Sequence, residues 1–205
     1  MLSSLWHTLN TALAPYGSSA LELVGFVFGV AAVWLMMRQH IAAWPVGLVN
    51  VALYAVLFTR AGLYSDAALQ VVYVALSAYG WWHWRRGDRV TRAELPVTRT
   101  PPREAWLAAS VALLVWVTLA TITSQLPGTS LPWLDAALVA GSLSTQWLAA
   151  RKRLENWACW IVLDTVYVGL FVYKQLLLTA LLYAVFTALA VRGHVLWSRA
   201  LRTAA

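Results

Sequence analysis

Seven long apolar stretches take up most of this chain, and they constrain its fold more than any other feature. They lie at about 20–38, 44–60, 64–84, 105–125, 133–150, 157–173 and 176–197. A helix needs about 20 mostly apolar residues to cross a bilayer, and backbone groups in lipid must be paired within their own segment. Only 11% of the residues are charged, whereas soluble domains average roughly 25%. We therefore expect an all-α integral membrane protein, with residues 1–205 forming a single membrane domain.

The basic residues predict the orientation of this domain. The one long polar connection, residues 85–104, is rich in Arg and Pro, which is typical of a solvated loop. If the N-terminus is outside, thirteen of the 15 Lys and Arg residues fall on the cytoplasmic side. This positive-inside bias predicts an N-out/C-in topology, and it explains the net charge of +7 without a nucleic-acid partner. The segment MLSSLWHTLN has no basic n-region, so we expect no cleaved signal peptide.

An internal repeat divides the chain. Residues 22–84 align with residues 135–197 at an offset of 113 without a gap, and sixteen of 63 pairs are identical. The identical pairs include three Trp pairs, an Arg pair and a Gly pair, which two apolar helices rarely share by chance. We expect repeat one at about 20–84, a linking helix at about 105–125 and repeat two at about 133–197. Three crossings and one linking helix make the repeats parallel, a 3+1+3 arrangement used by transporters that bind substrate between their halves.

Asp164 is the strongest candidate for a binding residue. It lies about seven residues into its predicted helix, and a carboxylate at that depth is costly enough to indicate function. Trp157, Trp160 and Tyr167 share its helix face, since the four residues are spaced by 3, 4 and 3. Aromatic rings around a carboxylate suit a flat organic cation. The alternative is an Asp that hydrogen-bonds a neighbouring helix, and for Trp157 it is an aromatic belt at the membrane interface.

The first repeat offers a second group of candidates. Asn50 and Tyr54 are one turn apart, and Trp44 precedes them at the helix start. Gln70 and Tyr73 share a stripe on the next helix, where Gln70 needs a hydrogen-bond partner. A substrate or another helix could supply that partner, and Trp44 could equally belong to an aromatic belt. We expect the Asn50 face to oppose the Asp164 face.

Catalytic and metal-binding patterns are missing from the sequence. The four histidines are dispersed, and no HExxH, GxSxG or P-loop motif occurs. The carboxylates are scattered, whereas a lipid-modifying enzyme needs several acid/base groups at one interface. We therefore expect no catalytic residues, no bound metal and no cofactor. A membrane enzyme and a non-transporting scaffold stay as distant alternatives.

The sequence resembles the PnuC family of bacterial vitamin transporters over roughly residues 20–197. The matching segments are WPVGLVN, LYSDAALQVVY and YGWW in the first repeat, and ENWACWIVLD, LTALLYAVF and RGHVLW in the second. The resemblance implies facilitated diffusion of a vitamin across the bacterial inner membrane, with phosphorylation by a cytoplasmic kinase trapping it inside. It also implies a fold similar to SWEET sugar porters, contact with membrane lipid and a homotrimer.

The resemblance implies nicotinamide riboside as the substrate, with thiamine or another B vitamin as the alternative. Members that carry nicotinamide riboside typically have Asn where this chain has Asp164, while Asn50 keeps the first-repeat pattern. Thiamine carriers of the family are often called PnuT, and other members are suspected of taking riboflavin. Nicotinamide riboside and thiamine are both aromatic cations, so a carboxylate suits either.

Overall fold

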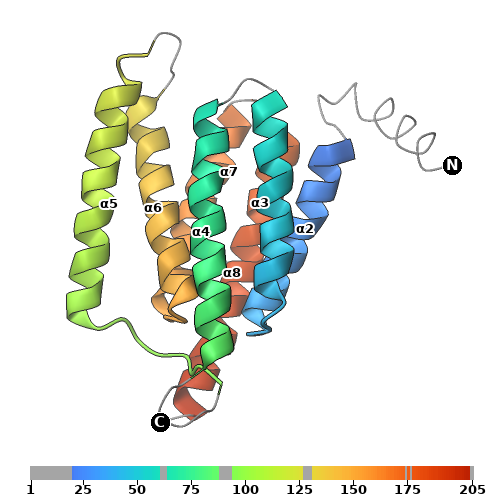
Figure 1. The fold of residues 1–205 in the computed structure, drawn as a ribbon, viewed down its shortest axis with the longest axis vertical. Helices are drawn as coiled ribbons and strands as arrows, with labels where there is room; N and C mark the ends of the chain where they lie inside the picture. Colours follow the sequence, from blue (N-terminus) through green and yellow to red (C-terminus); the bar gives the residue numbers. More distant parts are fainter. Residues whose placement is uncertain are drawn as a thin grey trace, which may run out of the picture. The chain divides into compact units, whose positions relative to one another are not determined.

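The computed structural model describes residues 20–60, 64–87, 94–126, 131–173, 175 and 177–203. Within these ranges the chain forms seven helices and no strand, which confirms the all-α prediction (Figure 1). The helices are α2 Ala20–Met37, α3 Ala43–Arg60, α4 Tyr64–Arg86, α5 Pro102–Thr123, α6 Pro132–Ala150, α7 Glu155–Tyr173 and α8 Leu177–Thr203. The N-terminal segment, for which we expect no cleaved signal peptide, lies outside the described residues.

Most helix ends fall within three residues of their predicted positions. The one larger difference among the described helices is at the end of α8. Helix α5 begins at Pro102, three residues early, because Pro is favoured in the first turn, where its missing N–H leaves no bond unmade. Helix α8 continues to Thr203, six residues beyond its predicted end. The prediction ended α8 where the apolar stretch ends, but residues 198–203 contain no Gly or Pro to stop a helix.

The helices present large apolar side chains outward. Helix α5 buries only Ala120 among its described residues, and Trp106 and Leu114 are 75% and 68% exposed. Soluble proteins rarely expose contiguous apolar patches of this kind. Three helical segments are long and apolar enough to cross a membrane, namely Pro102–Thr123, Glu155–Tyr173 and Thr179–Thr203. The chain is therefore a multi-pass membrane protein.

The chain forms two compact units, Met1–Ala78 and Tyr79–Ala205. In the first unit α2 packs against α3. Gly25 allows this close approach, because a Cβ there would lie 2.9 Å from Cε2 of the Tyr54 ring. The Nδ2 group of Asn50 donates a hydrogen bond to the Gly25 carbonyl at 2.7 Å.

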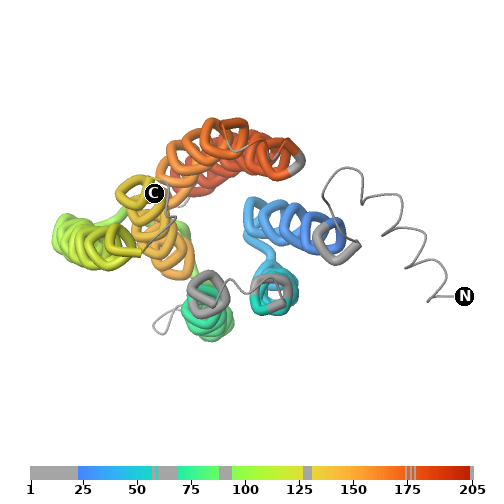
Figure 2. The backbone as a smooth tube through the Cα atoms, turned by 90° about the horizontal axis from the view of Figure 1, so that it is seen from above, coloured from blue at the N-terminus to red at the C-terminus, as the bar shows by residue number. Residues whose placement is uncertain are grey.

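In the second unit α5 packs on α6, α6 on α7, and α7 on α8. Figure 2 shows α7 and α8 side by side along their length. Glycines make these contacts close, because a Cβ at Gly193 would lie 2.7 Å from the Trp157 ring. A Cβ at Gly141 would lie 2.8 Å from Cδ2 of Leu163. A side chain at position 193 forces the Trp157 ring or a helix to move, whereas at position 141 a shift of the Leu163 side chain suffices.

The loops that join α2 to α3 and α6 to α7 have the same backbone geometry. Gln39 and Lys152, which are 113 residues apart, both have positive φ, at 59° and 56°. The amide nitrogen of Gln39 bonds the carbonyl oxygen three residues before it, and that of Lys152 does the same. The bounds of α2, α3 and α4, shifted by 113, fall within four residues of those of α6, α7 and α8.

Candidate functional site

Helix α7 carries a buried carboxylate within a largely apolar sequence. Asp164 is 3% exposed, and Leu170 on the same helix is also buried. Within the described part of the chain, no group donates a hydrogen bond to the Asp164 carboxylate. An ionised carboxylate without donors is costly in an apolar environment, and such residues in spanning helices mark binding sites or ion pathways. The arrangement leaves Asp164 able to pair with a cation.

Two aromatic residues, Tyr167 and Phe171, follow Asp164 on α7 within two turns, and both pack against Tyr183 of α8. Tyr167, which follows Asp164 by three residues, lies 4.6 Å from Tyr183 of α8 between ring centroids. Phe171 stacks on Tyr183 at 5.2 Å, and Phe186 meets Tyr183 edge-on at 5.7 Å. We call these four residues the aromatic cluster. Their faces carry negative electrostatic potential, so the cluster favours flat or cationic ligands.

Tyr183 and Phe186 are missing from the candidates drawn from the sequence. A signal for them exists in the internal repeat, because the offset of 113 places Tyr183 at the position of Gln70 and Phe186 at that of Tyr73. Gln70 and Tyr73 are candidates themselves. Applying the repeat to the site as well as to the fold therefore identifies both aromatic residues.

Trp157 is packed inside the second unit. It is 1% exposed, and its ring meets Trp197 edge-on at 5.4 Å. Its Nε1 group has no hydrogen-bond acceptor among the described residues. An aromatic-belt residue faces the lipid headgroups, so this burial argues against the belt interpretation. Trp160, one turn further along α7, is half-buried.

The candidates of the first unit lie on α3 and α4. Trp44 is 1% exposed at the start of α3, so it too is no belt residue. The side-chain Nδ2 of Asn50 bonds within the unit, and among the described residues no group donates to its Oδ1. Gln70 and Tyr73 are half-buried on α4. That Asn50 faces Asp164 stays a prediction.

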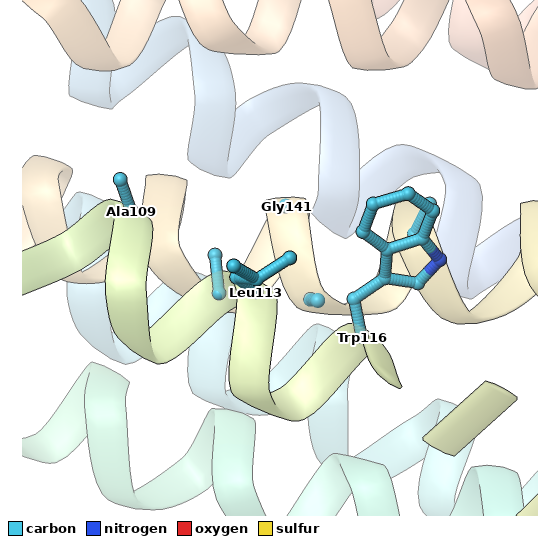
Figure 3. Close-up of a pocket in the computed structure, with 7 residues that line it drawn as sticks. Ala109, Leu113, Trp116 and Gly141 are labelled. Atoms are coloured by element: carbon cyan, nitrogen blue, oxygen red, sulfur yellow. The ribbon is translucent and has the colours of Figure 1, made fainter. Parts of the chain in front are cut away.

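An open groove between α5 and α6 has a volume of about 250 Å³ (Figure 3). It is lined by Ala109, Ala112, Leu113 and Trp116 of α5 and by Ala137, Ala140 and Gly141 of α6. The Trp116 indole N–H already donates to the Trp133 carbonyl at 2.9 Å. The groove thus lacks polar groups for a vitamin, and α7 is the better candidate site. Among the described residues, no three His, Cys, Asp or Glu side chains gather to hold a metal.

Apolar outer surfaces, and in a spanning helix a buried carboxylate that has no donor among the described residues, are features expected of a helical membrane carrier for a small molecule. A family model described as nicotinamide mononucleotide transporter matches residues 19–199, and the chain belongs to this family. Family membership, which the resemblance of the sequence predicts, is therefore confirmed. Its relatives are named as transporters, not as enzymes.

Three relatives with assigned functions align over most of the chain. The nicotinamide riboside transporter PnuC of Escherichia coli strain K12 is 26% identical and is aligned over 91% of this chain and 88% of its own. PnuC of Neisseria mucosa is 27% identical, over 88% of this chain and 73% of its own. The riboflavin/roseoflavin transporter RibM of Streptomyces davaonensis is 26% identical, over 86% and 83%.

A solved structure has the same fold. The crystal structure of the vitamin B3 transporter PnuC matches with a TM-score of 0.73 at 23% identity. The match covers 100% of this chain and 91% of that one. The helical architecture is therefore that of a known transporter.

Proposed function

We propose that this protein carries nicotinamide riboside across the bacterial inner membrane by facilitated diffusion. The observation that carries the proposal is the buried Asp164 carboxylate, which lacks a donor among the described residues and lies beside the aromatic cluster. Nicotinamide riboside is a flat aromatic cation, so it supplies both the charge that Asp164 needs and a ring for the cluster. Two relatives named as nicotinamide riboside transporters support the substrate.

The site in this proposal draws on both repeats. Its members are Trp44, Asn50, Tyr54, Gln70, Tyr73, Trp157, Trp160, Asp164 and Tyr167. The aromatic residues stack on or enclose the ring, while Asn50 and Gln70 hydrogen-bond the ribose or the amide. Asp164 pairs with the ring's positive charge. No coupling ion takes part, and phosphorylation by a cytoplasmic kinase traps the vitamin.

The proposed architecture has seven transmembrane helices in a parallel 3+1+3 arrangement, N-out/C-in, within a single domain. The matching helix bounds and loop geometries at an offset of 113 support the repeat. The concentration of Arg and Lys in the loops assigned to the cytoplasm supports the orientation. We expect a homotrimer surrounded by membrane lipid.

Thiamine is the second candidate, because Asp164 stands where carriers of nicotinamide riboside typically have Asn. Thiamine is also an aromatic cation, and a carboxylate recognises its charge equally well. Riboflavin, which one relative is named for, lacks a positive charge. The carboxylate therefore favours the two cations over riboflavin.

Uptake by proteoliposomes tests the proposal. Purified protein, reconstituted without ATP and without an ion gradient, should take up labelled nicotinamide riboside in a saturable way. Liposomes without protein serve as the control, and labelled thiamine is measured in parallel. If neither vitamin binds or enters, the proposed function is wrong.

A further inference from the structure

A stretch of the α4–α5 connection runs along the loop that precedes α7. We call residues 94–101 the strap and residues 151–154 the basic loop. The Thr98 amide donates to the Lys152 carbonyl at 3.2 Å, and the Leu154 amide donates to the Thr98 carbonyl at 2.9 Å. These two bonds make a short parallel bridge between Thr98 and Arg153. The strap is thereby tied to the backbone immediately before α7.

Ion pairs and side-chain hydrogen bonds reinforce this bridge at the start of α5. Nε of Arg153 donates to Glu104 Oε1 at 3.0 Å, and its Nη2 donates to Glu104 Oε2. The two side chains are only 15% and 11% exposed. Arg151 lies 3.5 Å from the same carboxylate. Bidentate Arg–carboxylate pairs of this kind fix geometry as well as charge.

A second set of contacts reaches α7 itself. The amide and the hydroxyl of Thr100 both donate to Glu155 Oε2, at 2.9 and 2.7 Å. Glu155 is the first residue of α7. The next residue, Asn156, is fully buried, and its side-chain Nδ2 donates to the Arg153 carbonyl. The strap therefore holds the first turn of the helix that carries Asp164.

Lys152, which belongs to the basic loop, binds the strap through its side chain. Its Nζ donates to the Leu95 carbonyl at 2.6 Å and lies 4.8 Å from the centre of the Trp84 ring. It is 3% exposed, and this burial lowers the pKa of its ammonium, an effect that Glu94 opposes. Burying a lysine is costly unless it is well paired, so this residue does more than orient the chain in the membrane.

Among the described residues, no segment pairs with the equivalent loop of the first unit as the strap pairs with the basic loop. Residues 38–41 repeat the backbone hydrogen bonds of residues 151–154. Within the described residues, Arg38 lies 4.4 Å from the Trp34 ring and forms no ion pair. The Ala42 amide bonds Nδ1 of His40 inside the loop. Since the described residues form this loop geometry at 38–41 with no strap paired to it, we infer that the geometry itself does not depend on the strap.

We propose that the strap is a positioning element, acting through the Glu104–Arg153 pair, that fixes the direction of α7 and so holds Asp164 and Trp157 in place for the ligand. This inference rests on the proposed function for its ligand. A site held in its binding geometry before the ligand arrives costs less to order. The strap should stay closed throughout transport, and its loss should loosen α7 against α6 and α8.

Cys159 is a built-in reporter of α7, because it is the chain's single cysteine and is half-buried in the second turn of that helix. The test compares Glu104→Gln with the matched control Arg103→Gln, an exposed neighbour in the same helical turn. Measured quantities are the labelling rate of Cys159 by N-ethylmaleimide in liposomes and the Kd for nicotinamide riboside. Thr100→Val, which removes one hydroxyl bond to Glu155, provides a milder variant if Glu104→Gln does not fold.

We expect Glu104→Gln to raise the labelling rate and the Kd about fivefold each, the upper range for a partly exposed ion pair. Thr100→Val should raise both about twofold, and Arg103→Gln should leave both unchanged. The swap Glu104→Arg with Arg153→Glu should restore part of the loss. If folded Glu104→Gln and Thr100→Val proteins keep the wild-type labelling rate and Kd, the inference is overturned. A lower melting temperature without a change in labelling rate or Kd would overturn it as well.

The labelling measurement separates this inference from the proposed function. If wild-type protein binds no vitamin, the proposed function fails, while faster Cys159 labelling in Glu104→Gln still supports the strap as the element that holds α7. If wild-type protein binds nicotinamide riboside and the variants match it in both measurements, only the strap inference fails.

Discussion

The helix pairs α2–α3 and α6–α7 occupy equivalent places in the repeat, but they use their polar residues differently. In the first pair, Asn50 Nδ2 bonds the Gly25 carbonyl and Tyr54 lies against that glycine, so both contribute to the packing of the two helices in addition to their proposed role at the ligand. In the second pair, the residue at the position of Asn50 is Leu163, which packs against Gly141. At this position the contact between α6 and α7 is therefore apolar.

One position further along α7 is the carboxylate of Asp164, and no group in the described residues donates to it. Tyr167, the equivalent of Tyr54, belongs to the aromatic cluster with Tyr183. We infer that a duplicated helix pair can keep its backbone while one copy uses polar groups in packing and the other leaves a carboxylate for a ligand.

The largest effect should come from removing that charge. Asp164→Asn should weaken nicotinamide riboside binding on the order of 30-fold, because truncating one partner of a buried charge pair costs about 2 kcal/mol or more. The variant should fold, since it no longer buries an unpaired carboxylate. Calorimetric titration measures the affinity, with Thr165→Val as the control on the same helix. An unchanged affinity would remove Asp164 from the site.

The next largest effect should be on the melting temperature, from a substitution at the contact between Gly193 and the Trp157 ring. Gly193→Ala places a Cβ 2.7 Å from the Trp157 ring, and overpacking of this kind costs about 1–3 kcal/mol. Gly169→Ala is the matched control, because no atom outside its own helix lies within 4 Å of the added Cβ. Thermal unfolding in detergent compares the two. Equal melting temperatures would show that α7 and α8 are not locked at this contact.

The aromatic cluster predicts a smaller effect at Tyr183. Tyr183→Leu removes a ring that contacts three others, and aromatic contacts are worth about 0.5–1.5 kcal/mol beyond buried area. We expect a three- to tenfold loss of nicotinamide riboside affinity, measured by titration. Tyr173→Leu, at an exposed tyrosine of α7, should change nothing. Equal effects of the two substitutions would separate the cluster from the site.

The smallest effect should come from making the first pair resemble the second. Asn50→Leu removes the bond to Gly25, and hydrogen bonds between membrane helices average about 0.6 kcal/mol. The melting temperature should fall slightly, and the affinity should fall less than in Asp164→Asn. An affinity loss larger than that of Asp164→Asn would reverse the comparison and place the main polar contact in the first unit.

Much of the fold could be predicted from the sequence because helix ends in a membrane protein follow apolar length, Pro and charge. The start of α5 is an example: apolar length predicts it at about residue 105, and the helix begins three residues earlier, at Pro102. The end of α8 is missed because apolar length sets where a helix leaves lipid, not where it stops.

The site could be predicted only in part. Asp164 is evident because a lone carboxylate in an apolar helix is costly wherever it lies. The contacts that position it depend on which side chains meet in space. Lys152 and Arg153 read from sequence as loop charges that orient the chain, yet Lys152 is buried and Arg153 pairs with Glu104, 49 residues away in sequence. No spacing rule predicts such a pair.

We propose that the second helix pair offers its carboxylate to a cationic vitamin. The most direct test of this proposal is a calorimetric comparison of wild-type protein titrated with nicotinamide riboside, a cation, and with riboflavin, which carries no positive charge. We predict that nicotinamide riboside binds at least about tenfold more tightly, as expected for a charge pair worth about 1.4 kcal/mol or more. Riboflavin binding as tight as that of nicotinamide riboside would contradict the account.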